Sequence, residues 1–319
     1  STRLLEEVLQ SNESVVALAL AGGALHYAAG DAPEVHRAQS PTEALPVGAP
    51  ARALFTLRGT SGEVLFVGTK GAGVQRCVGG TCARFAGGLL ATVDDEVTAV
   101  AALASPDLLL LGTPRGLILT RASDPSTGGP PGVVAGRRVL EGREVRQVVI
   151  SPASTPSQVK AWAATSEGLA ELTVRVENAF EPALAPVSVV LHGPPGLPDE
   201  DVLSVAVGPE GQVFAGTRKG FGSPGQPGPV LRDAPWHLPD DEVRALLFER
   251  QDAGGAEPRD VLWAGTKGGL VRYDVARDVV TLFGPAEGLP DAGVRALLKG
   301  PDGMRYIGTE RGVAGYGER

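Results

Sequence analysis

Short apolar segments recur along this chain, and most of them end in the same dipeptide, a glycine followed by a threonine. The pair stands at Gly68-Thr69, Gly112-Thr113, Gly216-Thr217, Gly265-Thr266 and Gly308-Thr309, with degenerate copies at Ala164-Thr165 and Ala28-Ala29. Neighbouring copies are 40 to 52 residues apart. That spacing is the length of one four-stranded blade of a β-propeller. The pattern therefore predicts an all-β chain in which seven small antiparallel sheets surround one axis.

The sixth copy shows the expected blade most clearly. Its four strands, lettered A to D from the axis outward, are predicted at 243–249, 261–265, 269–274 and 279–283. A bulky side chain stands two residues before the glycine and is expected to fill the space between blades. This bulky position holds Phe66, Leu110, Trp162, Phe214, Trp263 and Tyr306, with His26 in the first copy. The threonine hydroxyl is expected to bond the backbone of the B–C turn.

The last copy contains only three strands, while residues 1–13 precede the first blade and belong to none. We predict that Leu4 to Leu9 forms strand D of the seventh blade, so that residues 1–319 make one closed ring without open edges. The alternative is a short helix, because Leu-Leu-Glu-Glu-Val-Leu-Gln has good helical propensity.

Composition narrows the choice of partner. The formal net charge is −8, which argues against non-specific binding to nucleic acid or to anionic lipid. No apolar run approaches the roughly 20 residues that span a bilayer, so no transmembrane segment is expected. Ser1-Thr2-Arg3 lacks the pattern of a signal peptide. The frequent Ala and Gly and the preference for Arg over Lys indicate a GC-rich bacterial genome.

Cys77 and Cys82 are the only cysteines, in the segment Cys-Val-Gly-Gly-Thr-Cys. Gly79-Gly80 favours a two-residue hairpin turn, which would set the two cysteines opposite each other. We predict a disulfide between them, with two free thiols as the alternative. A disulfide would indicate an oxidising compartment, here the bacterial periplasm or the cell exterior.

The segment from Leu262 to Asp274 resembles the two-component regulator propeller repeat, whose unit reads roughly Leu-Trp-Ile-Gly-Thr-x-x-Gly-Leu-x-x-Tyr after a Gly-Leu-Pro lead-in. The lead-in is present as Gly196-Leu197-Pro198 and Gly288-Leu289-Pro290. The first blade and much of the third and fourth depart from the pattern. The resemblance implies a propeller of the kind found in extracytoplasmic sensors of hybrid histidine kinases. Since the chain carries no kinase or receiver, we expect a stand-alone ring.

Propeller topology places the D–A and B–C loops on one face, where ligands usually bind. The B–C turns supply the bases Lys70, Arg115, Arg218, Lys219, Lys267 and Arg311. The D–A loops supply the acids Asp94, Asp95, Glu96, Asp199, Glu200, Asp201, Asp240, Asp241, Glu242 and Asp291. This charged face is expected either to neutralise itself or to form a polar docking surface.

The second position of strand A holds arginine in four of the seven blades: Arg52, Arg146, Arg244 and Arg295. We expect these four to cluster at the mouth of the central channel. Each guanidinium could pair with a D–A loop acid, or the four together could hold an anion or carboxylate. With Lys267 and Arg218 they are the candidate ligand-binding residues.

No phosphate-binding loop, metal-binding motif or nucleophile elbow is present, so we predict neither a cofactor nor catalytic residues. The favoured function is a non-catalytic binding module, outside the cytoplasm, that docks a protein or glycan on the charged face, within an envelope or surface assembly if it is not free. The alternative is a propeller lyase or hydrolase, with His192 or His237 as a base beside Arg244 or Arg295. A purely structural spacer is a third reading.

Overall fold

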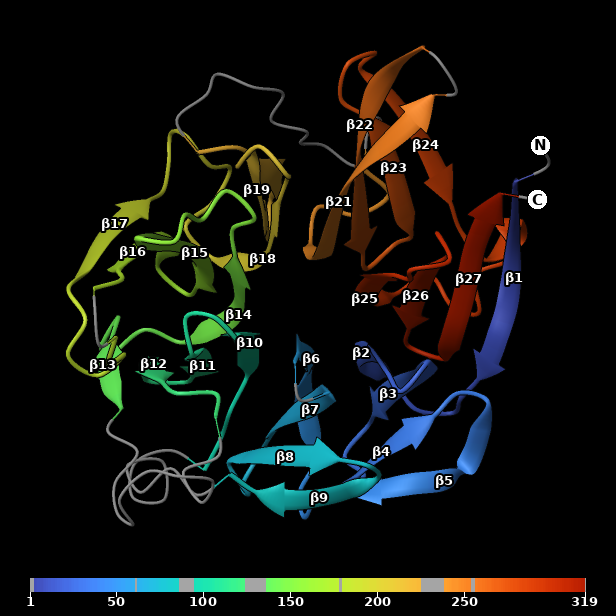
Figure 1. The fold of residues 1–319 in the computed structure, drawn as a ribbon. Helices are drawn as coiled ribbons and strands as arrows, with labels where there is room; N and C mark the ends of the chain where they lie inside the picture. The colour runs from blue at the N-terminus through green and yellow to red at the C-terminus, as the bar shows by residue number, and fades with distance from the viewer. Residues whose placement is uncertain are drawn as a thin grey trace.

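Seven small antiparallel sheets form a ring around one axis in the computed structural model, as far as its residues are described (Figure 1). The structure describes residues 3–60, 62–85, 95–123, 136–177, 180–224, 238–253 and 256–318. Within these ranges the only helical element is a 3-10 turn at Pro285–Glu287. The predicted seven-bladed β-propeller is confirmed.

The first four blades each contain four strands in sequence order from the axis outward. Blade 1 consists of β2 (Val15–Ala21), β3 (Ala24–Ala29), β4 (Glu34–Arg37) and β5 (Ser40–Pro46). Blade 2 consists of β6 (Ala51–Gly59), β7 (Gly62–Thr69), β8 (Val74–Val78) and β9 (Thr81–Arg84). Blade 3 consists of β10 (Ala99–Leu103), β11 (Leu108–Thr113), β12 (Gly116–Thr120) and β13 (Arg137–Val139). Blade 4 consists of β14 (Val145–Ile150), β15 (Gln158–Thr165), β16 (Gly168–Arg175) and β17 (Val187–His192).

The last three blades complete the ring. Blade 5 consists of β18 (Val202–Val207), β19 (Val213–Thr217) and β20 (Gly220–Gly222), and the chain that follows it, 225–237, lies outside the described residues. Blade 6 consists of β21 (Val243–Ala253), β22 (Ala256–Thr266), β23 (Leu270–Asp274) and β24 (Val279–Phe283). Blade 7 consists of β25 (Val294–Lys299), β26 (Arg305–Thr309), β27 (Gly312–Glu318) and β1 (Arg3–Gln10). The inner strands β2, β6, β10, β14, β18, β21 and β25 follow one another around the axis, and β25 returns to β2.

The ring closes through the N-terminal strand. β1 pairs antiparallel with β27 from Arg3 opposite Glu318 to Gln10 opposite Gly312, so the two ends of the chain lie side by side (Figure 1). The predicted closure is confirmed, and the helical alternative is wrong. The strand wins over local helical propensity because it packs Leu5 against the core of blade 7 and Leu9 against the core of blade 1.

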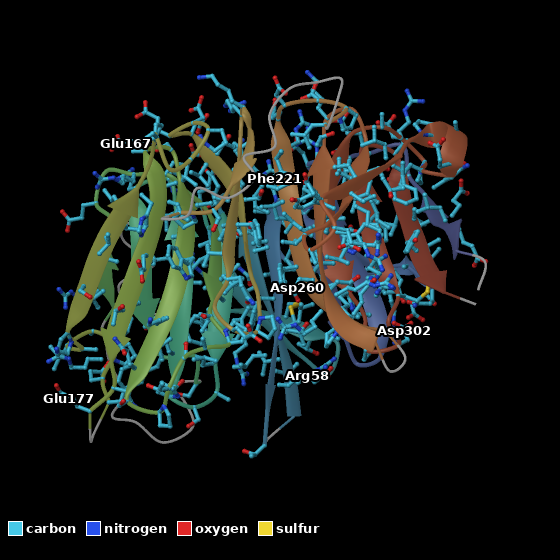
Figure 2. All side chains as sticks on the ribbon, turned by 90° about the horizontal axis from the view of Figure 1, so that it is seen from above. Arg58, Glu167, Glu177, Phe221, Asp260 and Asp302 are labelled. Carbon is cyan, nitrogen blue, oxygen red and sulfur yellow. A yellow bond between two sulfur atoms is a disulfide. The ribbon has the colours of Figure 1, made fainter. Side chains whose placement is uncertain are left out.

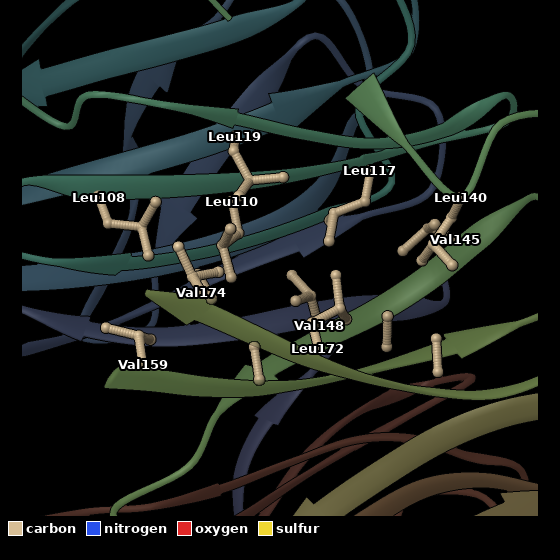
Figure 3. Close-up of a cluster of buried hydrophobic side chains, with 14 of the residues drawn as sticks. Leu108, Leu110, Leu117, Leu119, Leu140, Val145, Val148, Val159, Leu172 and Val174 are labelled. Carbon is tan, nitrogen blue, oxygen red and sulfur yellow. The ribbon is translucent and has the colours of Figure 1, made fainter. Parts of the chain in front are cut away.

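The hydrophobic core lies in the seams between blades. Figure 3 shows one such seam, where Leu108, Leu110, Leu117 and Leu119 of blade 3 meet Val148, Val159, Leu172 and Val174 of blade 4. All of these side chains are buried. Because each of these sheets buries its apolar side chains against the sheet of the next blade, neighbouring blades stabilise one another.

The threonines of the repeat fix the B–C turns as expected. The hydroxyl of Thr266 donates to the carbonyl of Gly269 at 2.9 Å, and the hydroxyl of Thr113 donates to the carbonyl of Gly116 at the same distance. The same bond recurs from Thr69, Thr165, Thr217 and Thr309. All six threonines are fully buried, so each hydroxyl satisfies itself within its own turn.

The glycine of the repeat has a different role, which the sequence did not show. A Cβ atom added to Gly112 would lie 2.8 Å from Val145 Cγ1, the first residue of the next inner strand. Gly68, Gly216, Gly265 and Gly308 meet Val97, Val243, Val294 and Val15 in the same way. Glycine is therefore required by the close approach of one blade to the next.

We expect Gly112→Ala to lower the free energy of unfolding by about 1–3 kcal/mol, because the added methyl overpacks a seam that cannot relax. Denaturant unfolding measures it. Gly193→Ala is the matched control, since nothing lies within 4 Å of a Cβ there, and its effect should stay within about 0.5 kcal/mol. Equal effects of the two substitutions would contradict the close-approach explanation.

A buried ion pair joins blades 6 and 7. Both carboxylate oxygens of Glu249 accept bonds from Arg305, with Arg305 Nη2 at 2.9 Å and Nε at 3.0 Å. Trp263 Nε1 donates to the same carboxylate at 3.0 Å, and the Glu249 side chain is not exposed at all. Burial alone would raise the pKa of Glu249, but the bonds from Trp263 and Arg305 outweigh it, so the pKa lies below its ordinary value.

We expect Glu249→Gln to lower the free energy of unfolding at pH 7 by about 3–5 kcal/mol, because it leaves Arg305 buried without its counter-charge. A carboxylate whose pKa is lower in the folded than in the unfolded state stabilises the fold at pH values above the unfolded pKa. This stabilisation is lost as the pH falls through the folded-state pKa. The difference between wild type and variant should therefore shrink at acid pH. Glu210→Gln removes an exposed partner of Arg250 and is the control, whose difference from the wild type should be small at all pH values. A pH-independent difference for Glu249→Gln would refute the assignment.

Candidate functional site

The second residue of the inner strand is a β-bulge in six of the seven blades. The ladder shifts register between residues 15 and 17, 51 and 53, 145 and 147, 202 and 204, 243 and 245, and 294 and 296. A bulge leaves one residue unpaired and turns its side chain out of the regular alternation. The residues turned out in this way are Val16, Arg52, Arg146, Leu203, Arg244 and Arg295, and Thr98 precedes β10 at the matching position of blade 3.

All seven of these residues line one central cavity of about 630 Å³. They stand where the inner strands begin, which is the face of the D–A and B–C loops. Figure 2 shows the two faces from the side, with the B–C turn residue Glu167 at one end and Arg58 and Glu177 at the other. The four arginines predicted to meet at the channel mouth do lie around one opening.

The arginines of blades 4 and 5 form ion pairs with carboxylates. Arg146 bonds Glu144 Oε2 at 3.2 Å and also pairs with Asp201 of the next blade. Asp201 in turn pairs with Arg218, whose Nη1 lies 3.7 Å from Glu242 Oε2. One carboxylate thus bridges two guanidinium groups and ties blade 4 to blade 5.

The same alternation continues through blades 6 and 7. Arg244 Nε donates to Glu242 Oε1 at 2.9 Å, and its Nη1 donates to Glu310 Oε1 at 2.9 Å. Glu310 Oε1 also accepts from Arg295 Nη2 at 3.2 Å. Four acids and four arginines therefore alternate along blades 4 to 7 on this face, and their charges cancel. We call this set the mouth chain: Glu144, Arg146, Asp201, Arg218, Glu242, Arg244, Glu310 and Arg295.

The pairing shifts the pKa of three members of the mouth chain toward the charged form. Burial alone would raise the pKa of Asp201, but the bonds from Arg146 and Arg218 hold it below its ordinary value. Glu310 shows the same balance between burial and its two arginines, and its pKa is also lowered. The bond to Asp201 raises the pKa of Arg218. In all three groups the ion pair favours the charged form.

Two candidate residues stand apart from the mouth chain. Arg52 Nη2 donates to Asp31 Oδ1 at 2.8 Å, and the Asp31 side chain is 85% exposed. That bond from Arg52 lowers the pKa of Asp31. Lys267 is exposed on the turn between β22 and β23 and forms no ion pair with the residues that the structure describes. Ligand binding by these residues stays a prediction.

The arginines do pair with acids, but only some of those acids were predicted. Asp201 and Glu242 come from D–A loops as expected, whereas Asp31 and Glu310 come from B–C loops. Sequence reasoning missed Glu310 because it treated the B–C turns as basic. The signal was its position directly after Gly308-Thr309. Of the predicted acids, Asp94 lies outside the described residues.

Below the mouth chain the cavity wall is uncharged. Leu18, Leu54, Phe55, Leu246 and Leu297 are among the residues that line it. The charged groups that line this cavity are therefore the four arginines at its upper end.

The histidine predicted for an enzyme site lies elsewhere. His192 is on β17, the outermost strand of blade 4, where Nε2 lies 3.0 Å from Glu171 Oε2 and the ring packs on Trp162. It touches no member of the mouth chain. His237 falls outside the described residues.

The described part of the chain holds no cluster of His, Cys, Asp or Glu that would bind a metal ion. Within the same residues no helix is long and apolar enough to cross a bilayer. Cys77 and Cys82 form the predicted disulfide, directly opposed across the hairpin with Val78 opposite Thr81. The free-thiol alternative is wrong.

Known structures share this architecture at low sequence identity. The extracellular domain of a hybrid two-component system from B. thetaiotaomicron aligns over all of this chain with a TM-score of 0.62 and 14% identity. Streptogramin B lyase aligns over 99% with a TM-score of 0.65 and 12% identity, and 97% of that protein is covered. PorZ, a surface component of the type-IX secretion system of Porphyromonas gingivalis, aligns over 94% with a TM-score of 0.66 and 16% identity.

These similarities show the fold alone. The chain spans 42% of the two-component protein and 46% of PorZ. No family model and no curated protein matches it. One structural neighbour is thus an extracellular domain of a two-component system. Membership of the two-component regulator propeller family stays a prediction.

A double-mutant cycle on Arg244 and Glu310 should reveal the strength of the mouth chain. Arg244→Gln and Glu310→Gln are each expected to destabilise the fold, with a coupling free energy of about 1 kcal/mol because the two share a network. Unfolding in denaturant at low ionic strength measures all four proteins. The pair Arg37 and Glu43, 42% and 66% exposed, is the control and should couple by about 0–0.5 kcal/mol. Equal coupling in both cycles would show that the mouth chain is ordinary surface.

Proposed function

We propose that this chain is a non-catalytic binding module outside the cytoplasm, and that its charged face docks a protein. The observation that carries the proposal is the mouth chain. It presents four carboxylates and four guanidinium groups in alternation along blades 4 to 7, held in place by mutual bonds. A fixed array of both signs favours a partner that carries both signs in a matching order.

A protein surface meets that requirement better than a glycan does. A neutral glycan carries no charges that could match the order of the mouth chain, and an acidic glycan complements only the arginines. Arg218 and Arg295 are 51% and 39% exposed, and Lys267 is exposed beside them. These three can contact a partner without any change in the fold, so docking costs little reorganisation.

The location is proposed from the disulfide. Cys77 and Cys82 would remain reduced in a bacterial cytosol, whereas the periplasm and the cell exterior maintain disulfides. The structural neighbours that are extracellular or surface proteins agree with this location. An envelope or surface assembly is therefore the proposed setting.

The alternative of a lyase or hydrolase stays a prediction. One structural neighbour is a lyase, but at 12% identity it informs the fold alone. The described histidines do not reach the mouth chain, and no second observation favours catalysis. We therefore retain binding as the function.

The test is capture from the envelope fraction of the source cells, using the immobilised protein. We expect the variant Arg218→Gln, Lys267→Gln, Arg295→Gln to recover at least about tenfold less of the specific partner, because it removes three exposed cations from the face. Raised salt should weaken capture by the wild type. Quantitative mass spectrometry measures recovery.

The matched control is Arg121→Gln, Arg250→Gln, Arg277→Gln. It removes the same charge from loops and strand ends on the opposite face, and it should capture as the wild type does. If all three proteins recover the same partners, the charged face is not the docking surface. If protease treatment of the captured material leaves the retained ligand intact, the ligand is a glycan and the choice of a protein is wrong.

A further inference from the structure

The bulky residue of each repeat fills the seam toward the following blade. Phe66 of blade 2 packs among Val97, Leu109 and Leu111 of blade 3. Trp263 of blade 6 packs against Tyr316 of blade 7, with ring centroids 4.9 Å apart. The corresponding residue fills each of four other seams in the same way: Phe214, Trp162, Leu110 and Tyr306. Six of the seven seams are thus closed by a large apolar side chain.

The seam between blade 1 and blade 2 breaks this rule. His26 takes the place of the large apolar residue, and a second cavity of about 520 Å³ opens there. Its wall comes from both blades: Ala21, Gly22, His26, Arg37, Glu43, Ala44 and Leu45 of blade 1, and Glu63, Leu65, Cys77, Gly79 and Gly80 of blade 2. These residues stand on A–B and C–D loops and the strand ends beside them, so the cavity opens opposite the charged face. We call it the seam pocket.

His26 lines the seam pocket and has one ring nitrogen that can accept a hydrogen bond. The side chain is 9% exposed, and Nδ1 lies 3.2 Å from the carbonyl oxygen of Ala24. A carbonyl can only accept, so Nδ1 carries the hydrogen. Burial lowers the pKa of His26, which outweighs the opposing effect of the Ala24 carbonyl, and the ring is therefore neutral at pH 7. Nε2 then holds a lone pair, and it has no hydrogen-bond partner among the described residues.

The other polar walls carry charge pairs that cancel. Arg37 Nη1 donates to Glu43 Oε2 at 3.1 Å. Glu63 accepts from Arg58 Nε at 2.7 Å and from the backbone N–H of Gly22 at 2.6 Å. The lining therefore offers two carboxylates and one guanidinium beside His26, and Arg58, just outside the lining, balances the second carboxylate.

Apolar groups complete the wall. Leu45 and Leu65 line the pocket beside Ala44, and the half-cystine Cys77 is buried next to them. The disulfide to Cys82 holds the Gly79-Gly80 turn that forms part of the rim. The pocket is thus shaped by a cross-linked hairpin rather than by a free loop, and its volume lies within the range of small-molecule sites, about 300–1,000 Å³.

We propose that the seam pocket binds one unit of a neutral saccharide. A sugar hydroxyl donates and accepts at one oxygen, which suits a wall where the acceptor Nε2, two carboxylates and a guanidinium lie close together. The C–H face of a sugar ring suits the leucine side chains. An anionic ligand would meet no net positive charge, and a cationic ligand would find both carboxylates already paired with Arg37 and Arg58. This site is separate from the charged face and does not depend on the proposed docking function.

The test is titration of the full chain with D-glucose, D-galactose, D-mannose and N-acetyl-D-glucosamine, followed by ligand-observed NMR. We expect at least one of them to bind with a dissociation constant of roughly millimolar. His26→Phe restores the apolar filling of the other seams, so it should weaken binding by at least about tenfold. The same variant should unfold at an equal or higher temperature than the wild type, because it fills a cavity.

Three further variants keep the result interpretable. His36→Phe makes the same chemical change one strand away, on a ring that stacks on Tyr27 outside the pocket, and it should bind as the wild type does. Glu63→Gln should weaken binding without the change in volume, which covers the case in which His26→Phe fails to fold. The variant Arg218→Gln, Lys267→Gln, Arg295→Gln should leave saccharide binding unchanged. No binding of any of the four sugars to the wild type, or unchanged binding by His26→Phe, overturns the proposal.

Discussion

The close approach of each blade to the next governs this structure. A glycine at the end of one blade's second strand lies against the first valine of the following inner strand, without room for a methyl group. The threonine that follows satisfies its own hydroxyl inside the turn, so it can be buried in the same contact at no cost in unpaired polar groups. This contact recurs at five of the seven seams, and alanine stands at the corresponding position of the other two, Ala28 and Ala164.

Once that spacing is set, every departure from the repeat has a defined place. In six blades the bulge at the second residue of the inner strand sends one side chain toward the opening, and arginine at four of these positions brings charge to an otherwise uncharged channel. The histidine in blade 1 removes bulk from one seam and opens a pocket on the other face. Both candidate sites therefore arise at positions of the repeat. At one, a bulge turns a side chain toward the opening, and at the other, histidine replaces a large apolar residue.

Backbone pairing and ion pairs join elements that are far apart in the chain. Strand β1 completes blade 7 by backbone pairing, and the ion pair of Glu249 with Arg305 adds a buried link between blades 6 and 7. At the charged face, the mouth chain links blades 4 to 7 through shared carboxylates. These polar links therefore add to the hydrophobic seams, which join the same neighbouring blades.

The sequence alone determined the number of blades, the closure by the N-terminal strand, the hairpin disulfide and the arginines at the channel mouth. Each of these follows from local spacing or from repetition, which a single chain displays openly. Two partners of the arginines were decided only by tertiary structure, because Asp31 reaches Arg52, and Glu310 reaches Arg244, from a neighbouring blade. The seam pocket was also hidden, since His26 reads as one degenerate position until the residues of blade 2 stand opposite it. Repetition predicts the frame, and contacts between segments far apart in the chain decide what the frame can bind.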